Sequence, residues 1–123
     1  MKYGLTPEQW QQAVDEVREI CIDVAGQRSL ITYGEVCKRM RTVNPHPGSY
    51  VFQAMLREMC FSEEAAGRGL LCALVVNQSK GIPGAGFFRA LGQERPQFAD
   101  DLQAGWREEC EFLYQFWSEE GGE

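Results

Sequence analysis

A run of seven residues without a polar side chain constrains the fold of this 123-residue chain most strongly. It reads Leu70-Leu71-Cys72-Ala73-Leu74-Val75-Val76, so its odd and even positions are apolar alike. A strand with two apolar faces has to be covered on both sides. The sequence therefore predicts a buried strand over residues 70–76.

Helical patterns account for most of the remaining chain. Thr6, Pro7 and Gln9 form a helix-start signal: an N-cap, a proline in the first turn and the second half of a capping box. Ser49 is a further N-cap residue. Helices are predicted over about residues 7–25, 33–40, 49–66 and 87–91, and from 101 towards the C-terminus, with fraying over 118–123.

Two further segments favour extended structure. Residues 29–33 contain residues with a preference for strands, and residues 82–88 contain glycines and a proline that resist a helix. The turn at residues 77–81 would join residues 70–76 and 82–88 into a hairpin. The predicted fold class is α+β: a helix-rich single domain of three to four helices with a small antiparallel β-hairpin, in winged-helix-like order.

Composition and charge narrow the class of protein. Hydrophobic residues are 44% of the chain and charged residues 24%, which is typical of a globular protein. No apolar run is long enough for a membrane span and the N-terminus does not resemble a signal peptide, so we expect a cytoplasmic protein without membrane contact. The net charge is −6, with −7 over residues 99–123 and +4 over residues 38–95. This basic excess is smaller than strong nucleic-acid binders usually show.

The cysteines predict buried thiols rather than a metal centre. There are five, an odd number, and none is spaced as Cys-x-x-Cys. His46 is the one histidine of the sequence, which disfavours a zinc site. We expect neither a metal nor a cofactor.

Two short segments of the sequence resemble a known protein family. They are residues 31–36 (Ile-Thr-Tyr-Gly-Glu-Val) and residues 72–77 (Cys-Ala-Leu-Val-Val-Asn). They resemble the winged-helix, DNA-binding domain of the alkyltransferase and alkyltransferase-like DNA-repair family, over about residues 8–90. The resemblance implies that Tyr33 presses on a DNA phosphate and that Cys72 stands in the place of the methyl-acceptor cysteine.

This sequence departs from the family pattern at the residues that carry the chemistry. Leu71, Ala73 and Leu74 replace the proline, histidine and arginine that flank the family's cysteine, so Cys72 lacks an adjacent base. Val51 stands where the family has the arginine that replaces a flipped base. The repair activity is therefore not carried over. The whole chain also resembles small uncharacterised bacterial proteins of the accessory genome, through residues 73–77, 81–88 and 106–117.

Three sets of residues are candidate functional sites. The glycine-rich loop is a candidate anion site through Lys80, Gly84, Gly86 and Arg89, the alternative being a tight turn that packs Phe87 and Phe88 into the core. Candidate nucleic-acid contacts are Tyr33, Lys38, Arg39, Arg41 and Gln53, the alternative being an exposed basic helix face. Candidate interface residues are Trp106, Phe112, Phe116 and Trp117, the alternative being one broad buried face.

These patterns favour a non-enzymatic small binding or interaction protein, expected to form a homodimer and to take a protein partner or a small ligand. The alternative is a winged-helix DNA-binding protein. A weaker alternative is a thiol-dependent enzyme that uses Cys72.

Overall fold

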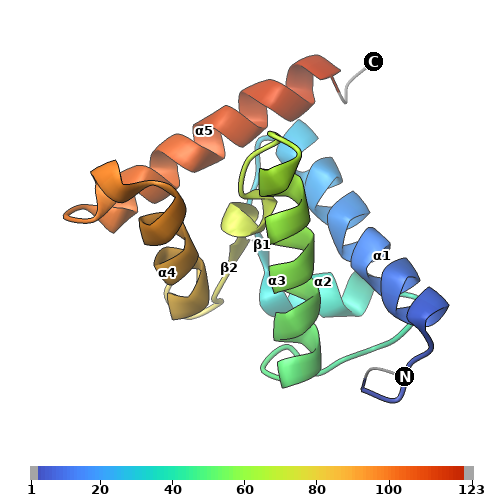
Figure 1. Cartoon of the computed structure of the whole chain (residues 1–123). Coiled ribbons are helices and arrows are strands. Elements are labelled where there is room, and N and C mark those ends of the chain that lie inside the picture. The colour runs from blue at the N-terminus through green and yellow to red at the C-terminus, as the bar shows by residue number, and fades with distance from the viewer. Residues whose placement is uncertain (1–2, 121–123) are drawn as a thin grey trace.

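The computed structural model describes residues 3–120 and shows a helix-rich α+β fold over that range (Figure 1). The elements are α1 (Pro7–Gly26), β1 (Ile31–Thr32), α2 (Tyr33–Arg39), α3 (Tyr50–Ala65), the 3-10 helix η1 (Leu71–Leu74), β2 (Val75–Val76), α4 (Ala85–Glu94), the 3-10 helix η2 (Pro96–Phe98) and α5 (Leu102–Glu120). The described range has five α-helices, which overlap the five predicted helical ranges, so the three to four helices of the predicted fold class are too few. The fraying expected for residues 118–123 concerns, in part, residues outside this range. Within it, no helix has the length and apolarity that a bilayer crossing requires.

Local capping signals start three of the helices. The Thr6 hydroxyl accepts a hydrogen bond from the Gln9 N–H, and the Gln9 side chain accepts one from the Thr6 N–H, which completes the predicted capping box. Thr32 and Ser49 cap α2 and α3, each accepting from a backbone N–H three residues further on. These starts were predictable because each depends on residues within one turn of the chain.

The segment 70–76 is buried as predicted, but most of it is not a strand. Residues 71–74 form η1, and only Val75–Val76 are extended. This strand pairs in parallel with β1, with Ile31 opposite Val75 and Thr32 opposite Val76. The predicted antiparallel hairpin is therefore wrong. Residues 82–84 are irregular and α4 begins at Ala85, so β1 is the strand that pairs with β2.

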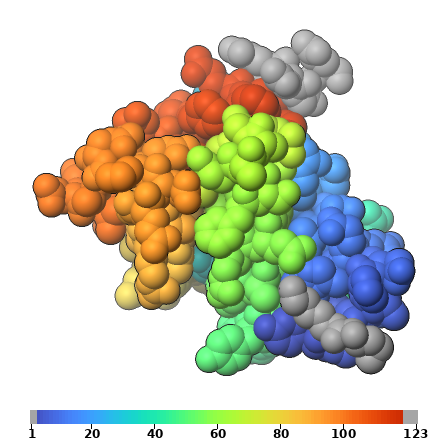
Figure 2. Space-filling model, viewed as in Figure 1, coloured from blue at the N-terminus to red at the C-terminus, as the bar shows by residue number. Residues whose placement is uncertain are grey.

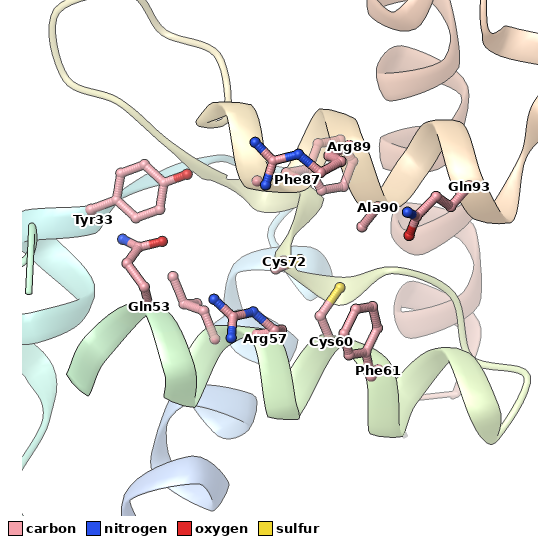
Figure 3. A pocket seen from close by; sticks show the side chains of 12 residues that line it. Tyr33, Gln53, Arg57, Cys60, Phe61, Cys72, Phe87, Arg89, Ala90 and Gln93 are labelled. Carbon is pink, nitrogen blue, oxygen red and sulfur yellow. The ribbon is translucent and has the colours of Figure 1, made fainter. Parts of the chain in front are cut away.

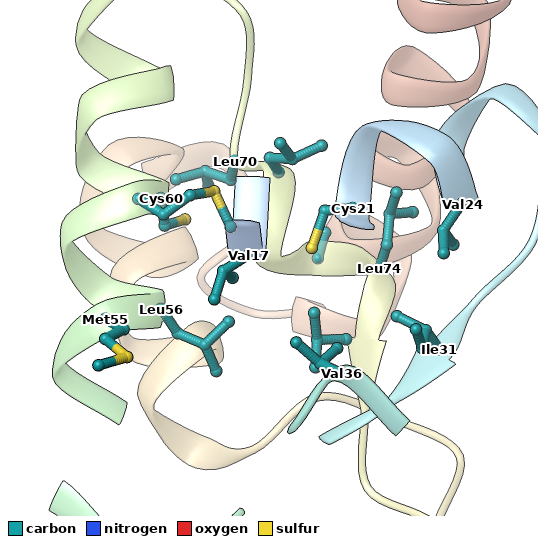
Figure 4. Close-up of a cluster of buried hydrophobic side chains, with 14 of the residues drawn as sticks. Val17, Cys21, Val24, Ile31, Val36, Met55, Leu56, Cys60, Leu70 and Leu74 are labelled. Atoms are coloured by element: carbon teal, nitrogen blue, oxygen red, sulfur yellow. The ribbon is translucent and has the colours of Figure 1, made fainter. Parts of the chain in front are cut away.

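The extensive burial of residues 70–76 explains why their apolar pattern predicted a strand where most of the segment is a 3-10 helix. Segment η1 contacts α1, α3 and α5, so its side chains are covered apart from that of Cys72, which is half-buried. An apolar run that is covered all round looks the same for a strand and for a short helix. Figure 4 shows the resulting cluster, in which Leu70 and Leu74 lie among side chains of α1, α2, α3 and β1.

Helix α5 satisfies backbone groups of this buried segment. The Leu70 N–H donates to the Glu109 carboxylate at 2.7 Å, and the Trp106 indole N–H donates to the Ala73 carbonyl at 2.7 Å. Burial raises the pKa of Glu109, although the Leu70 N–H and the charge of Arg95 both favour its ionised form. Unpaired backbone groups in the core would cost free energy, so these two contacts position α5.

A second buried carboxylate ties α3 to α1. Glu63 is 1% exposed, and it accepts hydrogen bonds from Arg18 at 3.0 Å and from Arg68 at 2.7 Å. Burial alone would raise the pKa of Glu63, but the hydrogen bonds from Arg68 and Arg18 outweigh burial and leave it below its ordinary value. A carboxyl with a lowered pKa stabilises the fold above its unfolded-state pKa and loses that contribution as pH falls through the lowered value.

We predict that Glu63→Gln lowers the free energy of unfolding at pH 7 by about 2 kcal/mol, because both arginines lose a charged acceptor. The difference from wild type should shrink as pH falls from 7 to 3, since a carboxyl with a lowered pKa loses its contribution to stability as pH drops below its unfolded-state pKa. Urea denaturation at both pH values measures this. Glu111→Gln is the matched control, because Glu111 forms only an exposed pair with Arg28 at 3.7 Å. A Glu63→Gln difference that stays constant from pH 7 to pH 3 would contradict the assignment.

Candidate functional site

A pocket of about 180 Å³ lies between α3 and α4. Figure 2 shows the surface hollowed between these two helices. Residues at helical spacing on one side of each helix form its walls, and Tyr33 and Cys72 complete it (Figure 3). The wall residues are Gln53, Leu56, Arg57, Cys60 and Phe61 on α3, and Gly86, Phe87, Arg89, Ala90 and Gln93 on α4.

The pocket brings together parts of two candidate sites that the sequence kept separate. Tyr33 and Gln53 come from the nucleic-acid set, and Gly86 and Arg89 come from the glycine-rich loop. The other members of both sets lie outside the pocket lining: Lys38, Arg39, Arg41, Lys80 and Gly84. Arg39 forms an ion pair with Glu35 at 3.2 Å, whereas Lys38 and Arg41 are exposed.

Two arginines give the pocket its charge. Arg57 and Arg89 stand on opposite walls, both are exposed, and neither guanidinium has an ion pair or a hydrogen-bond partner within residues 3–120. The lining contains no aspartate or glutamate. By contrast, Arg18 and Arg95 are held by Glu63 and Glu64 at 3.0 Å. The pocket is therefore a positive site in a chain of net charge −6.

Tyr33 connects the pocket to the loop before α4. It is the first residue of α2, and its hydroxyl oxygen accepts a hydrogen bond from the Gly84 N–H at 2.7 Å. Its ring meets Phe52 edge to face, with 6.4 Å between ring centroids. A Cβ on residue 84 would lie 3.1 Å from the tyrosine oxygen, so glycine permits this close approach. Burial raises the pKa of Tyr33, so the hydroxyl keeps its proton at neutral pH and can donate it.

The walls carry matching polar residues. Gln53 and Arg57 are four residues apart on α3, and Arg89 and Gln93 are four apart on α4, so each pair shares one helix face. One Gln53 N–H is used, because its Nε2 donates to the Pro47 carbonyl at 3.2 Å. Between the walls the lining is apolar, with Leu56 and Phe87 5% and 7% exposed.

Cys72 lies in the pocket as an unactivated thiol. It is half-buried, while the other four cysteines are buried, and all five are free. The thiol of Cys60, burial and the thiol of Cys21 raise the pKa of Cys72 well above its usual range. The thiolate is the nucleophilic form, so a raised pKa leaves Cys72 protonated at neutral pH. The geometry thus gives no support to a thiol-dependent enzyme.

We predict that Cys72 in the folded protein reacts with iodoacetamide at pH 7.5 more slowly than it does in urea-unfolded protein. Its raised pKa leaves a smaller fraction of the reactive thiolate than a free cysteine has at this pH. Peptide mass spectrometry after timed alkylation measures the rate at each cysteine, and Cys110 serves as the buried control. Alkylation of folded Cys72 faster than in the unfolded chain would restore the enzymatic alternative.

The four candidate interface residues divide between core and surface. Trp106 donates to the Ala73 carbonyl, and Trp117 is 9% exposed with the Arg18 guanidinium 5.7 Å from its ring centre. Phe112 is 43% exposed and stacks on half-buried Phe116, with 6.0 Å between ring centroids. Trp106 and Phe116 are both half-buried, Trp117 is buried, and Phe112 is the exposed member of the four.

Sequence reasoning missed Arg57, Gln93, Leu56 and Phe61 as pocket residues. Arg57 could have been found from Gln53, because the two are four residues apart on one predicted helix. Gln93 could not, since it lies beyond the predicted end of its helix at residue 91.

Comparison of the chain with protein-family models, with curated proteins and with solved structures finds no significant match. The function is therefore argued from the pocket itself.

Proposed function

We propose that the chain is a non-enzymatic binding protein that holds a small, negatively charged ligand in the pocket between α3 and α4. The observation that carries this proposal is the pair of guanidinium groups of Arg57 and Arg89, on opposite walls of one pocket and without a partner among the described residues. A guanidinium has five N–H donors and no acceptor, so it is suited to carboxylates and phosphates. No acidic residue of the lining competes for these donors.

The character of the lining favours binding over catalysis. A general base needs a group that can lose its proton near neutral pH. The titratable lining residues besides the arginines are Tyr33, Cys60 and Cys72, and raised pKa values keep Tyr33 and Cys72 protonated. Donors at the walls and an apolar floor are the usual composition of a binding pocket.

Benzoate tests this function, because it joins one carboxylate to one small ring. We predict that benzoate raises the Tm of the wild-type chain, since a ligand at ten times its Kd stabilises the native state by about 1.4 kcal/mol. Arg57→Gln and Arg89→Gln should each reduce the shift by at least half. Benzyl alcohol should give no shift, because it lacks the charge.

Arg107→Gln is the matched control for these variants. Arg107 is exposed on α5, lies outside the pocket and has no ion pair within the described residues. Its loss should leave the benzoate shift unchanged. Equal shifts in all three variants, or no shift with any small carboxylate or phosphate in the wild type, would refute the proposed function.

Binding of DNA is the second candidate, supported by the position of Tyr33 and Gln53 in this positive pocket. Exposed Lys38 and Arg41 near the end of α2 could add phosphate contacts. This candidate requires binding to duplex DNA that weakens steeply with added salt and that Lys38→Gln or Arg41→Gln reduces. The same variants should leave the benzoate shift intact if the pocket serves a small ligand.

Self-association through α5 is proposed as the partner contact, and Phe112 and Phe116 carry it. Both aromatics lie on one helix face and remain partly uncovered. Aromatic residues are enriched at the centres of interfaces, where each buries a large area. A dimer built on this face would bury them.

We predict that Phe112→Glu lowers the dimer fraction at least about fivefold in sedimentation velocity, because it places a charge in an apolar contact. Gln115→Glu is the matched control, since it adds the same charge to an exposed position of the same helix. A folded Phe112→Glu variant that dimerises like the wild type would rule out this face.

A further inference from the structure

Four polar side chains lie on one side of the pocket, and the amide of a fifth, Gln93, lies on the other side with Phe61 (Figure 3). In Figure 3 the Tyr33 hydroxyl, the Gln53 amide and the guanidinium groups of Arg57 and Arg89 point towards the same region. Phe61 and Cys60 lie at the other end, on α3. A ligand that fits this arrangement has a charged head at one end and an apolar body at the other.

The end of the pocket that holds the two guanidinium groups supplies mainly donors, with the Gln53 Oε1 as an acceptor among them. The Tyr33 oxygen already accepts the Gly84 N–H, so its own O–H is left to donate. Gln53 has one N–H left after its bond to the Pro47 carbonyl. Arg57 and Arg89 add two full positive charges. Gly86, in the first turn of α4, also lines the pocket, where the helix dipole favours an anion.

Charge balance favours a phosphate monoester over a carboxylate as the head group. A carboxylate has one negative charge and leaves one arginine uncompensated. A phosphate monoester carries a charge of about −1.5 to −2 at pH 7 and three strong acceptor oxygens. Guanidinium groups bind phosphate oxygens in a bidentate manner, so two arginines, a hydroxyl and an amide can all be satisfied.

The pocket as a whole has room for one ring. An apolar cavity of about 150 Å³ is enough to hold benzene, and the volume of this pocket is about 180 Å³. Leu56 and Phe87 add buried apolar surface to the pocket lining. Phe61 is 44% exposed and stacks on no other ring within residues 3–120, so its face is free for a flat partner.

We propose that the ligand of this pocket is an aryl phosphate, a phosphate monoester carried on a single aromatic ring. This inference rests on the proposed function and names its ligand class. The phosphate contacts Tyr33, Gln53, Arg57 and Arg89, and the ring lies against Phe61 and Leu56. An aryl phosphate can be a free small molecule or a phosphotyrosine side chain of a partner protein, and the two share this chemistry.

Calorimetric titration of the full chain with four probes tests the ligand class: phenyl phosphate, benzoate, inorganic phosphate and phenol. We expect phenyl phosphate to bind at least about tenfold more tightly than benzoate, because its second charge engages the second arginine. Inorganic phosphate should bind more weakly than phenyl phosphate, since it lacks the ring. Phenol should not bind measurably.

Substitutions test the anion contacts and the ring contact of the pocket separately. Arg57→Gln and Arg89→Gln should each weaken phenyl phosphate at least about tenfold, and Arg107→Gln should not. Phe61→Ala should weaken phenyl phosphate and leave inorganic phosphate unchanged, because only the ring contacts Phe61. Far-ultraviolet circular dichroism verifies that each variant is folded.

The outcomes distinguish this inference from the proposed function. If benzoate binds as tightly as phenyl phosphate and still needs Arg57 and Arg89, the anion pocket stands and the aryl phosphate is refuted. If no anionic probe binds, both fail. A short phosphotyrosine peptide that binds more tightly than phenyl phosphate identifies a protein-borne ligand, whereas weaker binding of the peptide identifies a free one.

Discussion

Burial of the segment 70–76 is the constraint on which the rest of this structure depends. Its apolar side chains are covered by α1, α3 and α5, so these helices have to assemble around it. Most of the segment is a 3-10 helix, and its backbone groups therefore lack the regular partners that a strand would have in a sheet. Glu109 and Trp106 of α5 supply partners for Leu70 and Ala73. The acidic C-terminal helix is thus part of the core architecture rather than an appendage.

The pocket follows from the same arrangement. The chain leaves the buried segment through β2, and the Tyr33–Gly84 hydrogen bond ties the loop before α4 to the start of α2 (Figure 1). Helix α4 then lies beside α3, and Cys72 of the buried segment lies between them (Figure 3). The space left between the two helices collects Arg57 and Arg89 without any acidic neighbour in the lining. Within residues 3–120 these two guanidinium groups have no partner, so the pocket is a positive site in an acidic chain.

The interactions that could be predicted are those between residues that lie close together in the sequence. The caps at Thr6, Thr32 and Ser49 act within one turn, so helix starts could be read directly. The parallel pairing of Ile31 with Val75 joins distant residues, and neither segment signals its partner. The sequence also named four residues of the pocket as candidates, but it did not show that they lie in one site. These are Tyr33, Gln53, Gly86 and Arg89. The spacing of Arg57 to Gln53 could have placed it on the same helix face, but its lack of an ionic partner within residues 3–120 is a property of the folded surface.

Nuclear magnetic resonance mapping of benzoate binding tests the central claim most directly, because it locates the ligand without assuming its position. Titration should shift the side-chain N–H signals of Gln53 and Gln93 and the Nε–H signals of Arg57 and Arg89, all of which line the pocket. Signals of Arg107 should stay in place. Shifts confined to Lys38 and Arg41, or to the Phe112 face of α5, would contradict the account and move the binding site away from the space between α3 and α4.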